Sequence, residues 1–198
     1  MASPQQPSLQ VRRRPPLRLV RDGDDPQDGA FDPSDLDGVF RRYAPYVATI
    51  SLRILGCDDD VDDLVQEVFL DAHRRRNELR EASAIRGWLA RVTVRKAVRK
   101  LRRGKLRRWL ALDEHPDYAG LADPSATPEQ RAEVGRVYRV LDRVTAEERV
   151  AWVLRYVQEY SLDEIAELAS VSRSTVQRRI RAAQAAVMTP SVPGGAHD

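Results

Sequence analysis

Apolar residues recur at intervals of three and four positions along most of this chain, and nowhere do they alternate one by one with polar residues. The first spacing places side chains on one face of an α-helix, whereas alternation would place them on one face of a β-strand. A chain that shows only the helical spacing can form a core only by packing helices against helices. The sequence therefore predicts an all-α protein.

Three helical stretches between residues 34 and 108 predict a first small helical domain. The first stretch runs from residue 34 to about residue 54 and contains Pro45, which lacks a backbone N–H and is expected to kink or break the helix. The second, over 60–76, carries its apolar residues on one clean face. The third covers about 84–103.

A second helical domain is predicted over 128–188, after a flexible linker at 109–127 that is rich in turn-forming residues. Thr127, Thr145 and Ser161 each have Gln or Glu three residues later, which is the capping box that opens a helix. Two small domains can each bury a modest core if the helices pack efficiently.

The two ends of the chain show no periodicity and are expected to be disordered. Residues 1–33 combine an Arg- and Pro-rich stretch with an acidic, Gly-rich one, and residues 189–198 contain Pro and Gly. Such compositions rarely bury enough apolar surface to order a chain. The N-terminal arginines are read as a solvated tail, with a basic arm that touches nucleic acid as the alternative.

Composition excludes several classes of protein. The single cysteine, Cys57, excludes a disulfide scaffold and a zinc site built from several cysteines. No apolar run approaches the roughly 20 residues of a membrane span, and no signal-peptide core is present. We therefore expect a cytoplasmic protein that does not insert into membranes.

The strongest local motif lies at residues 161–187. A short helix, a break at 169–171 and a longer helix capped by Ser172 match the helix-turn-helix pattern, whose second helix enters the DNA major groove. Residues 172–187 contain four Arg and no acid, as contact with phosphates requires. The alternative is a helical hairpin with a solvated Arg face. The candidate DNA-binding residues are Arg173, Ser174, Thr175, Gln177, Arg178 and Arg181.

Two further segments have opposite charge, although the net charge of the chain is only +3. Residues 84–112 contain eleven Lys or Arg and no acid, which predicts a polyanionic partner, and Trp88 could stack on a base or pack in the core. Residues 58–71 contain seven Asp or Glu and no base. This acidic block lacks the spacing and the Gly of a calcium loop, so a basic protein partner is favoured over a metal.

Catalysis finds little support in the sequence. His115 and His197 fall in the predicted linker and tail, His73 lies among arginines, and Cys57 has no identifiable base partner. A Gly-rich phosphate loop is absent. We expect no catalytic residue, no metal site and no cofactor.

Three segments together resemble bacterial RNA polymerase sigma factors. They read DDLVQEVFL at 62–70, GWLARV at 87–92 and STVQRRI at 174–180. The organisation into two domains, without further domains, resembles that of the extracytoplasmic-function (ECF) group. The resemblance covers residues 34–188, approximately. An alternative is a stand-alone helix-turn-helix regulator.

The resemblance implies a role for each segment. Asp63, Gln66 and Glu67 would dock on the clamp helices of the polymerase β′ subunit. The recognition helix at the C-terminus would read the minus-thirty-five element, and its domain would rest on the β flap. An anti-sigma factor is a further expected partner. The minus-ten promoter element would be bound and melted by Trp88, Arg91, Arg95, Lys96, Arg99, Arg102 and Arg103.

The sequence departs from the family pattern at four positions, two in the basic segment and two in the helix-turn-helix segment. Members often carry Asn or Asp where this chain has Arg95 and Arg99, so phosphate affinity is expected to increase there. Ser172 and Ser174 stand where Pro and Gly are frequent. The expected protein is thus a non-enzymatic adaptor between RNA polymerase and promoter DNA.

Overall fold

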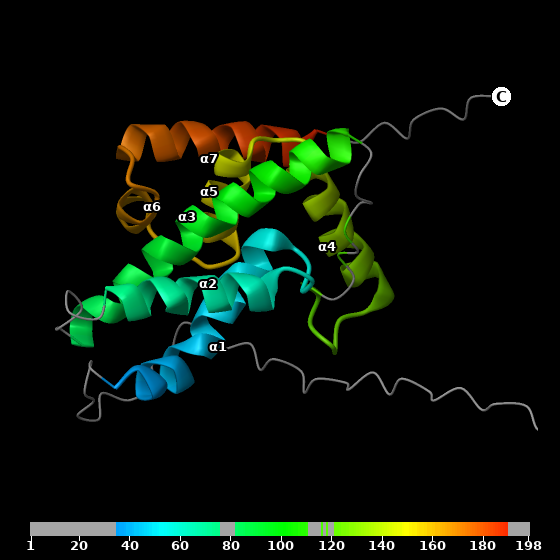
Figure 1. Ribbon diagram of the computed structural model, residues 1–198. Coiled ribbons are helices and arrows are strands. Elements are labelled where there is room, and N and C mark those ends of the chain that lie inside the picture. Colours follow the sequence, from blue (N-terminus) through cyan, green and yellow to red (C-terminus); the bar gives the residue numbers. More distant parts are fainter. Residues whose placement is uncertain (1–34, 76–81, 111–115, 117, 119–120, 190–198) are drawn as a thin grey trace, which may run out of the picture.

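The computed structural model describes residues 35–75, 82–110, 116, 118 and 121–189 of the chain. These residues form helices and no strand, which confirms the all-α prediction. In Figure 1 the long α3 crosses the middle of the molecule, with α1 and α2 on one side and α5, α6 and α7 on the other. The predicted tail at 1–33 and nearly all of 189–198 lie outside the described residues. The helices are α1 (Leu36–Leu55), α2 (Val61–Arg74), α3 (Ala82–Trp109), α4 (Pro128–Leu141), α5 (Ala146–Tyr156), α6 (Leu162–Ala169) and α7 (Arg173–Met188).

The first three helices build one part of the core. α1, α2 and α3 contact one another, and each turns its apolar stripe inward. α3 ends at Trp109 rather than near residue 103, because Gly104 is followed by Lys, Leu and Arg, which favour helix. The largest fully buried side chains of this part are Val47, Ile50, Ile54, Val61, Leu64, Val68, Ile85, Leu89 and Val94.

Of the kink or break expected at Pro45, the break does not occur, because α1 continues through the proline as one helix. Proline leaves the carbonyl four residues earlier, that of Arg41, without its helical donor. Both Pro45 and Arg41 are exposed, so water can reach the carbonyl that the proline leaves free. The side chain of Thr49 donates to the carbonyl oxygen of Pro45 at 2.9 Å on the next turn.

The predicted helix caps of the second half are confirmed. The hydroxyl of Thr127 accepts from the backbone N–H three residues later, and that residue's side chain accepts from the N–H of Thr127. The same reciprocal bonds form at Thr145 and Ser161, and Ser172 caps α7 with its hydroxyl alone. The hydrogen bonds from Ser161 lower the pKa of Glu164. Each such cap stabilises its helix by about 1 kcal/mol.

Helices α4 to α7 bury the rest of the core. α5 and α4 pack against α7, and α6 packs against both α5 and α7. This arrangement places α6 and α7 as an exposed helix-turn-helix over a support formed by α5. The buried side chains that hold it are Leu141, Val150, Val153, Leu154, Ile165, Leu168, Val176, Ile180 and Ala183.

The two sets of helices also pack directly against each other. α3 lies along α5 and α6, and α1 contacts α5. The hydroxyl of Tyr138 donates to the carbonyl oxygen of Arg53 at 2.6 Å, and the hydroxyl oxygens of Tyr46 and Tyr160 lie 2.8 Å apart. Tyr118, in the predicted linker, is buried at the same boundary. The described part of the linker is therefore anchored between the two sets.

Tyr138 makes this boundary sensitive to alkali. Burial raises the pKa of its hydroxyl from 10 to about 12, because the protonated form alone can stay in the core and donate to Arg53. A raised folded-state pKa stabilises the fold below pH 10 and loses that contribution as the pH climbs to 12. At about 1.4 kcal/mol per pKa unit, we expect Tyr138 to account for a loss of about 3 kcal/mol in urea unfolding across this window. Tyr138→Phe should lose clearly less than the wild type over the same window, and equal losses in both proteins would contradict the assignment.

Candidate nucleic-acid interface

The helix-turn-helix is set by a tight left-handed turn between α6 and α7. Ser170 ends α6 with φ 53°, and its N–H and that of Val171 return to carbonyls of α6. Ser172 then starts α7, with its hydroxyl accepting from the N–H of Thr175 at 3.3 Å. Ile165 of α6 and Val176 of α7 are both fully buried beneath the turn. These contacts fix the first turn of α7 at the molecular surface.

Most of the predicted recognition residues on α7 are accessible. Arg173, Arg178 and Arg181 are exposed, and we call them the α7 arginine face. Arg173 lies 3.5 Å from Asp163 of α6, so part of its charge is balanced within the motif. Ser174 is exposed, whereas Thr175 and Gln177 are half-buried. Arg178 and Arg181, three residues apart, share one side of the helix and are the two cations best placed to reach a groove.

α3 carries a row of four arginines. Arg91, Arg95, Arg99 and Arg102 recur at intervals of three and four residues, so they share one helix face, and all four are exposed. We call this set the α3 arginine row. The next residue, Arg103, is also exposed. Together these cations form the basic stripe expected of a surface that follows a phosphate backbone.

Lys96 and Trp88, grouped with these arginines in the sequence, are placed differently. Lys96 is only 8% exposed, and its Nζ lies 3.2 Å from Glu67 Oε2 and 3.0 Å from Asp71 Oδ2, both on α2. Its charge is therefore committed to joining α2 and α3. Trp88 is half-buried and packs against the apolar core, which was the second of the two alternatives for this residue.

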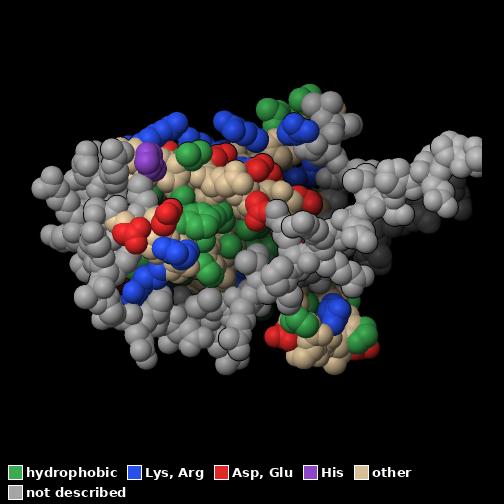
Figure 2. Space-filling model, turned by 60° about the horizontal axis from the view of Figure 1, so that its bottom comes forward, with side chains coloured by type: hydrophobic (Ala, Val, Ile, Leu, Met, Phe, Trp, Pro, Cys, Tyr) green, Lys and Arg blue, Asp and Glu red, His purple; other side chains and the backbone are tan. Residues whose placement is uncertain are grey.

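The acidic block forms a surface on α2. Asp63, Gln66 and Glu67 are exposed, and we call them the α2 acidic surface. Glu67 belongs to it while also pairing with Lys96. Figure 2 views the molecule from the α1 and α2 side and shows acidic side chains beside a patch of hydrophobic ones. Phe40 of α1 is 46% exposed, and its ring centroid lies 4.8 Å from that of the half-buried Phe69 of α2.

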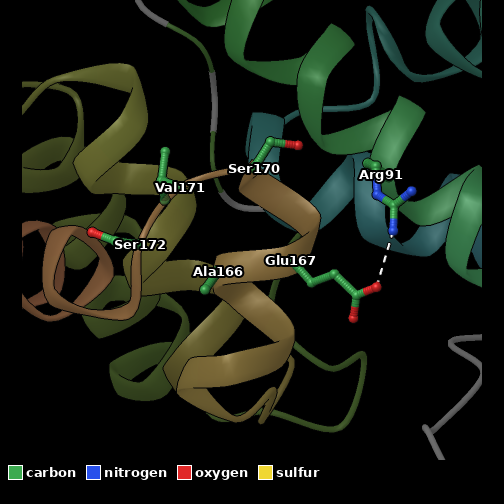
Figure 3. A pocket seen from close by; sticks show the side chains of 6 residues that line it. All are labelled: Arg91, Ala166, Glu167, Ser170, Val171 and Ser172. Atoms are coloured by element: carbon green, nitrogen blue, oxygen red, sulfur yellow. Dashed lines mark hydrogen bonds and ion pairs between the residues drawn. The ribbon is translucent and has the colours of Figure 1, made fainter.

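Two glutamates face the α3 arginine row, and neither was recognised in the sequence as part of a site. In Figure 3 Arg91 reaches from α3 towards Glu167 of α6, and their nitrogen and oxygen lie 3.1 Å apart. Arg102 forms an ion pair with Glu147 at the start of α5. The sequence offers only a weak signal for these two glutamates. Glu147 lies in the first turn of α5, and Glu167 lies near the end of α6.

Two observations bear on reactive groups in the described part of the chain. Burial, together with the nearby Asp59 and Asp60, raises the pKa of the Cys57 thiol, which disfavours the reactive thiolate. Among the residues that the structure describes, no three His, Cys, Asp or Glu side chains meet in a way that could hold a metal ion. None of the described helices has the length and hydropathy needed to cross a membrane.

Comparison with protein families matches both halves of the chain. Residues 39–107 match the family described as Sigma-70 region 2, and residues 135–186 match Sigma-70, region 4. The chain is 31% identical over 156 residues to the ECF RNA polymerase sigma factor SigM of Mycobacterium tuberculosis, covering 79% of this chain and 76% of SigM. It is 30% identical over 155 residues to the ECF RNA polymerase sigma-E factor of Escherichia coli, covering 74% and 81%.

Solved structures show the same fold. The sigma factor RpoE of Bartonella quintana, in complex with the anti-sigma factor NepR, superposes with a TM-score of 0.58 at 16% identity, covering 78% of this chain and 94% of RpoE. CnrH, in complex with the cytosolic domain of CnrY, gives 0.51 at 24% identity, covering 77% and 84%. With both family regions in order and relatives matched over three quarters of their length, the chain belongs to the ECF RNA polymerase sigma factors, which bind core RNA polymerase and direct it to promoters.

Proposed function

We propose that this sigma factor binds polymerase through the α2 acidic surface and promoter DNA through the α3 arginine row and the α7 arginine face. The observation that carries this is the separation of charge over different helices. An acidic surface repels DNA phosphates and suits a basic protein, whereas two arginine surfaces suit DNA. A stand-alone regulator needs no acidic docking surface of this kind.

On this proposal, Asp63, Gln66 and Glu67 dock on the clamp helices of the polymerase β′ subunit. Asp63 and Gln66 project from α2 into solvent and need no rearrangement to make contact. Glu67 is held in place by Lys96, so its carboxylate is positioned before a partner arrives. Charges of this kind on an interface act mainly on specificity and association rate.

The minus-ten element is assigned to α3. The exposed Arg91, Arg95, Arg99, Arg102 and Arg103 contact the phosphates, and half-buried Trp88 supports the helix at the start of the row. Opening a base pair costs a few kcal/mol, and capture of the unstacked base can offset this cost. The mechanism is therefore binding energy applied to DNA melting, with no covalent chemistry in this chain.

The minus-thirty-five element is assigned to α7, through Arg173, Ser174, Thr175, Gln177, Arg178 and Arg181. Arg can pair with guanine and Gln with adenine in the major groove. The unit 128–188 rests on the β flap and the unit 34–108 on the clamp, with 109–127 between them. Two weak readers held on one polymerase act at high effective concentration.

The proposal also includes a cellular location and a regulatory partner. A promoter-reading subunit works in the cytoplasm beside the chromosome and has no enzymatic activity of its own. Because the fold matches that of RpoE, whose structure holds the anti-sigma factor NepR, we extend an anti-sigma partner to this chain. The exposed apolar side chains beside the α2 acidic surface give such a partner something to bury.

Transcription with core polymerase tests the proposal. The chain plus core polymerase should yield run-off transcripts from a defined class of promoters in a library. Asp63→Ala with Gln66→Ala should weaken binding to core polymerase by about tenfold or more, because exposed interface residues of this type are removed from the centre of the contact. Run-off yield at limiting sigma concentration should fall in parallel.

The control changes two exposed acids away from the α2 acidic surface. Glu129→Ala with Glu133→Ala lies on α4 and should weaken polymerase binding clearly less. A chain that protects a promoter without polymerase and does not bind core polymerase would instead be a stand-alone regulator, and the proposal would fail.

A further inference from the structure

A cavity lies between α3 and helices α5 to α7. Its volume is about 340 Å³, which is within the range of sites that bind small molecules. Figure 3 shows the shallower depression next to it, which shares Arg91 and Ser170 with the cavity. Sites of this kind combine an apolar lining with a few charged or polar groups that fix the ligand. The lining of this cavity therefore indicates what it could bind.

The floor of the cavity is apolar. Val98 of α3 and Ala169 of α6 are half-buried and Leu168 is 9% exposed, so each still presents surface to the cavity. Val150 of α5 and Ile165 of α6 are buried and complete the same lining. An apolar group that displaces water from such a surface gains free energy. The floor thus suits the hydrocarbon part of a ligand.

The rim of the cavity is strongly basic. All four members of the α3 arginine row line it, and Arg179 adds a fifth guanidinium from α7. Arg179 is half-buried and was not among the residues singled out in the sequence. Among the described residues that line the cavity, Glu147 is the only carboxylate, and it pairs with Arg102. Positive charge is therefore in excess around a small space.

Three of these five arginines have no acidic partner in the part of the chain that the structure describes. They are Arg95, Arg99 and Arg179, whereas Arg91 and Arg102 pair with glutamates at the two ends of the row. Like charges around one small space repel one another, and a bound anion would offset this repulsion. A guanidinium can donate two parallel hydrogen bonds to a carboxylate or a phosphate. The rim thus suits the charged group of a ligand.

We propose that this cavity binds a small amphipathic organic anion, meaning a molecule with one carboxylate or phosphate group attached to an apolar body. The rim arginines bind the charged group, and the floor covers the apolar body. Charge alone would also suit DNA, but a duplex is far wider than this cavity and has no apolar body for the floor to cover. The inference does not depend on which residues contact the promoter.

Displacement of a fluorescent probe from the full chain tests the cavity. Anilinonaphthalene sulfonate joins an anionic group to apolar rings, so its fluorescence should rise on binding, and octanoate should displace it. Inorganic phosphate lacks the apolar body and octanol lacks the charge, so each should displace the probe about tenfold more weakly or less. Octanoate should also raise the thermal midpoint of unfolding as its concentration increases. Displacement by phosphate or by octanol as effective as that by octanoate would overturn the proposal.

Two charge variants should shift octanoate affinity in opposite directions. Arg179→Gln removes a cation of the rim and should weaken binding by about tenfold. Glu147→Gln removes the carboxylate of the lining and should tighten binding several-fold, and a gain of affinity cannot come from a damaged fold. The matched controls are Arg178→Gln, which lies next to Arg179, and Glu133→Gln, which removes an acid paired with Arg136 on α4. Neither control residue lines the cavity, so both should change affinity clearly less. Equal effects in variants and controls would place the ligand elsewhere.

A third variant tests the apolar floor. Ala169→Phe keeps every charge and adds a ring to the lining, so octanoate affinity should fall by about tenfold or more. If circular dichroism shows that this variant loses helicity, Glu147→Gln and its control decide alone. A wild-type chain that supports run-off transcription but binds neither the probe nor millimolar octanoate overturns this inference and leaves the proposed function intact. A chain that binds octanoate as expected but gives no transcript from any promoter overturns only the proposed function.

Discussion

Leu154→Ala should lower the free energy of unfolding by about 2–5 kcal/mol, the range for a leucine removed from a tightly packed core. Leu154 is fully buried on α5, the helix that supports α7. The cavity left by the substitution would lie where the helix-turn-helix meets the rest of the protein. The orientation of the helix-turn-helix therefore depends on the Leu154 side chain. Urea unfolding followed by circular dichroism measures the loss, and the thermal midpoint should fall with it.

The same substitution at an exposed leucine is the control. Leu106 on α3 is 57% exposed, and Leu106→Ala should change the free energy of unfolding by no more than about 0.5 kcal/mol. A small effect at both positions would mean that α5 is not part of a cooperative core. A large effect at Leu106 would mean that the C-terminal end of α3 is covered in solution.

Local sequence rules predicted the helices of this protein well. The capping boxes at Thr127, Thr145 and Ser161 formed as expected, because both partners of each box lie within four residues. At Pro45 the helix does not break, because the carbonyl that the proline leaves free is exposed to solvent. The predicted end of α3 near residue 103 was wrong, because Gly104 alone did not stop the helix before the helix-favouring residues that follow it.

The charge of the sequence predicted where the candidate site lies, but not which of its side chains are free to bind a partner. A count of cations treats Lys96 like its exposed neighbour Arg95. Lys96 lies one turn after the buried Val92, however, and so shares the inward face of the helix. Glu67 and Asp71, four residues apart on α2, were the signal that could have identified it. The packing of the two halves left no local signal, because Arg149 of α5 donates to carbonyl oxygens of α1 that lie 95 and 94 residues away in the chain.

Replacing Arg95 and Arg99 with alanine should weaken promoter binding by the holoenzyme and reduce its salt dependence. If each arginine contacts one phosphate, the slope of log K against log salt should fall by about 1.4–1.8, and affinity near 0.15 M salt should fall on the order of tenfold. Both side chains are exposed, and neither forms an ion pair with any of the described residues. Their loss should therefore not destabilise the fold. Filter binding of promoter DNA over a salt series, with sigma saturating, gives both quantities.

Lys96→Met supplies the comparison, because it removes a cation from the same helix and an adjacent position. Lys96 is buried against Glu67 and Asp71, so its loss should leave the salt slope unchanged and instead lower the stability of the α2 and α3 pair. A slope reduced equally by Lys96→Met would place Lys96 on DNA and contradict the burial seen here. A slope reduced only by the arginine pair would show that the two arginines act as phosphate contacts, at positions where the sequence departs from the family pattern. Extra charge at these positions would then strengthen DNA binding in general, whatever the base sequence.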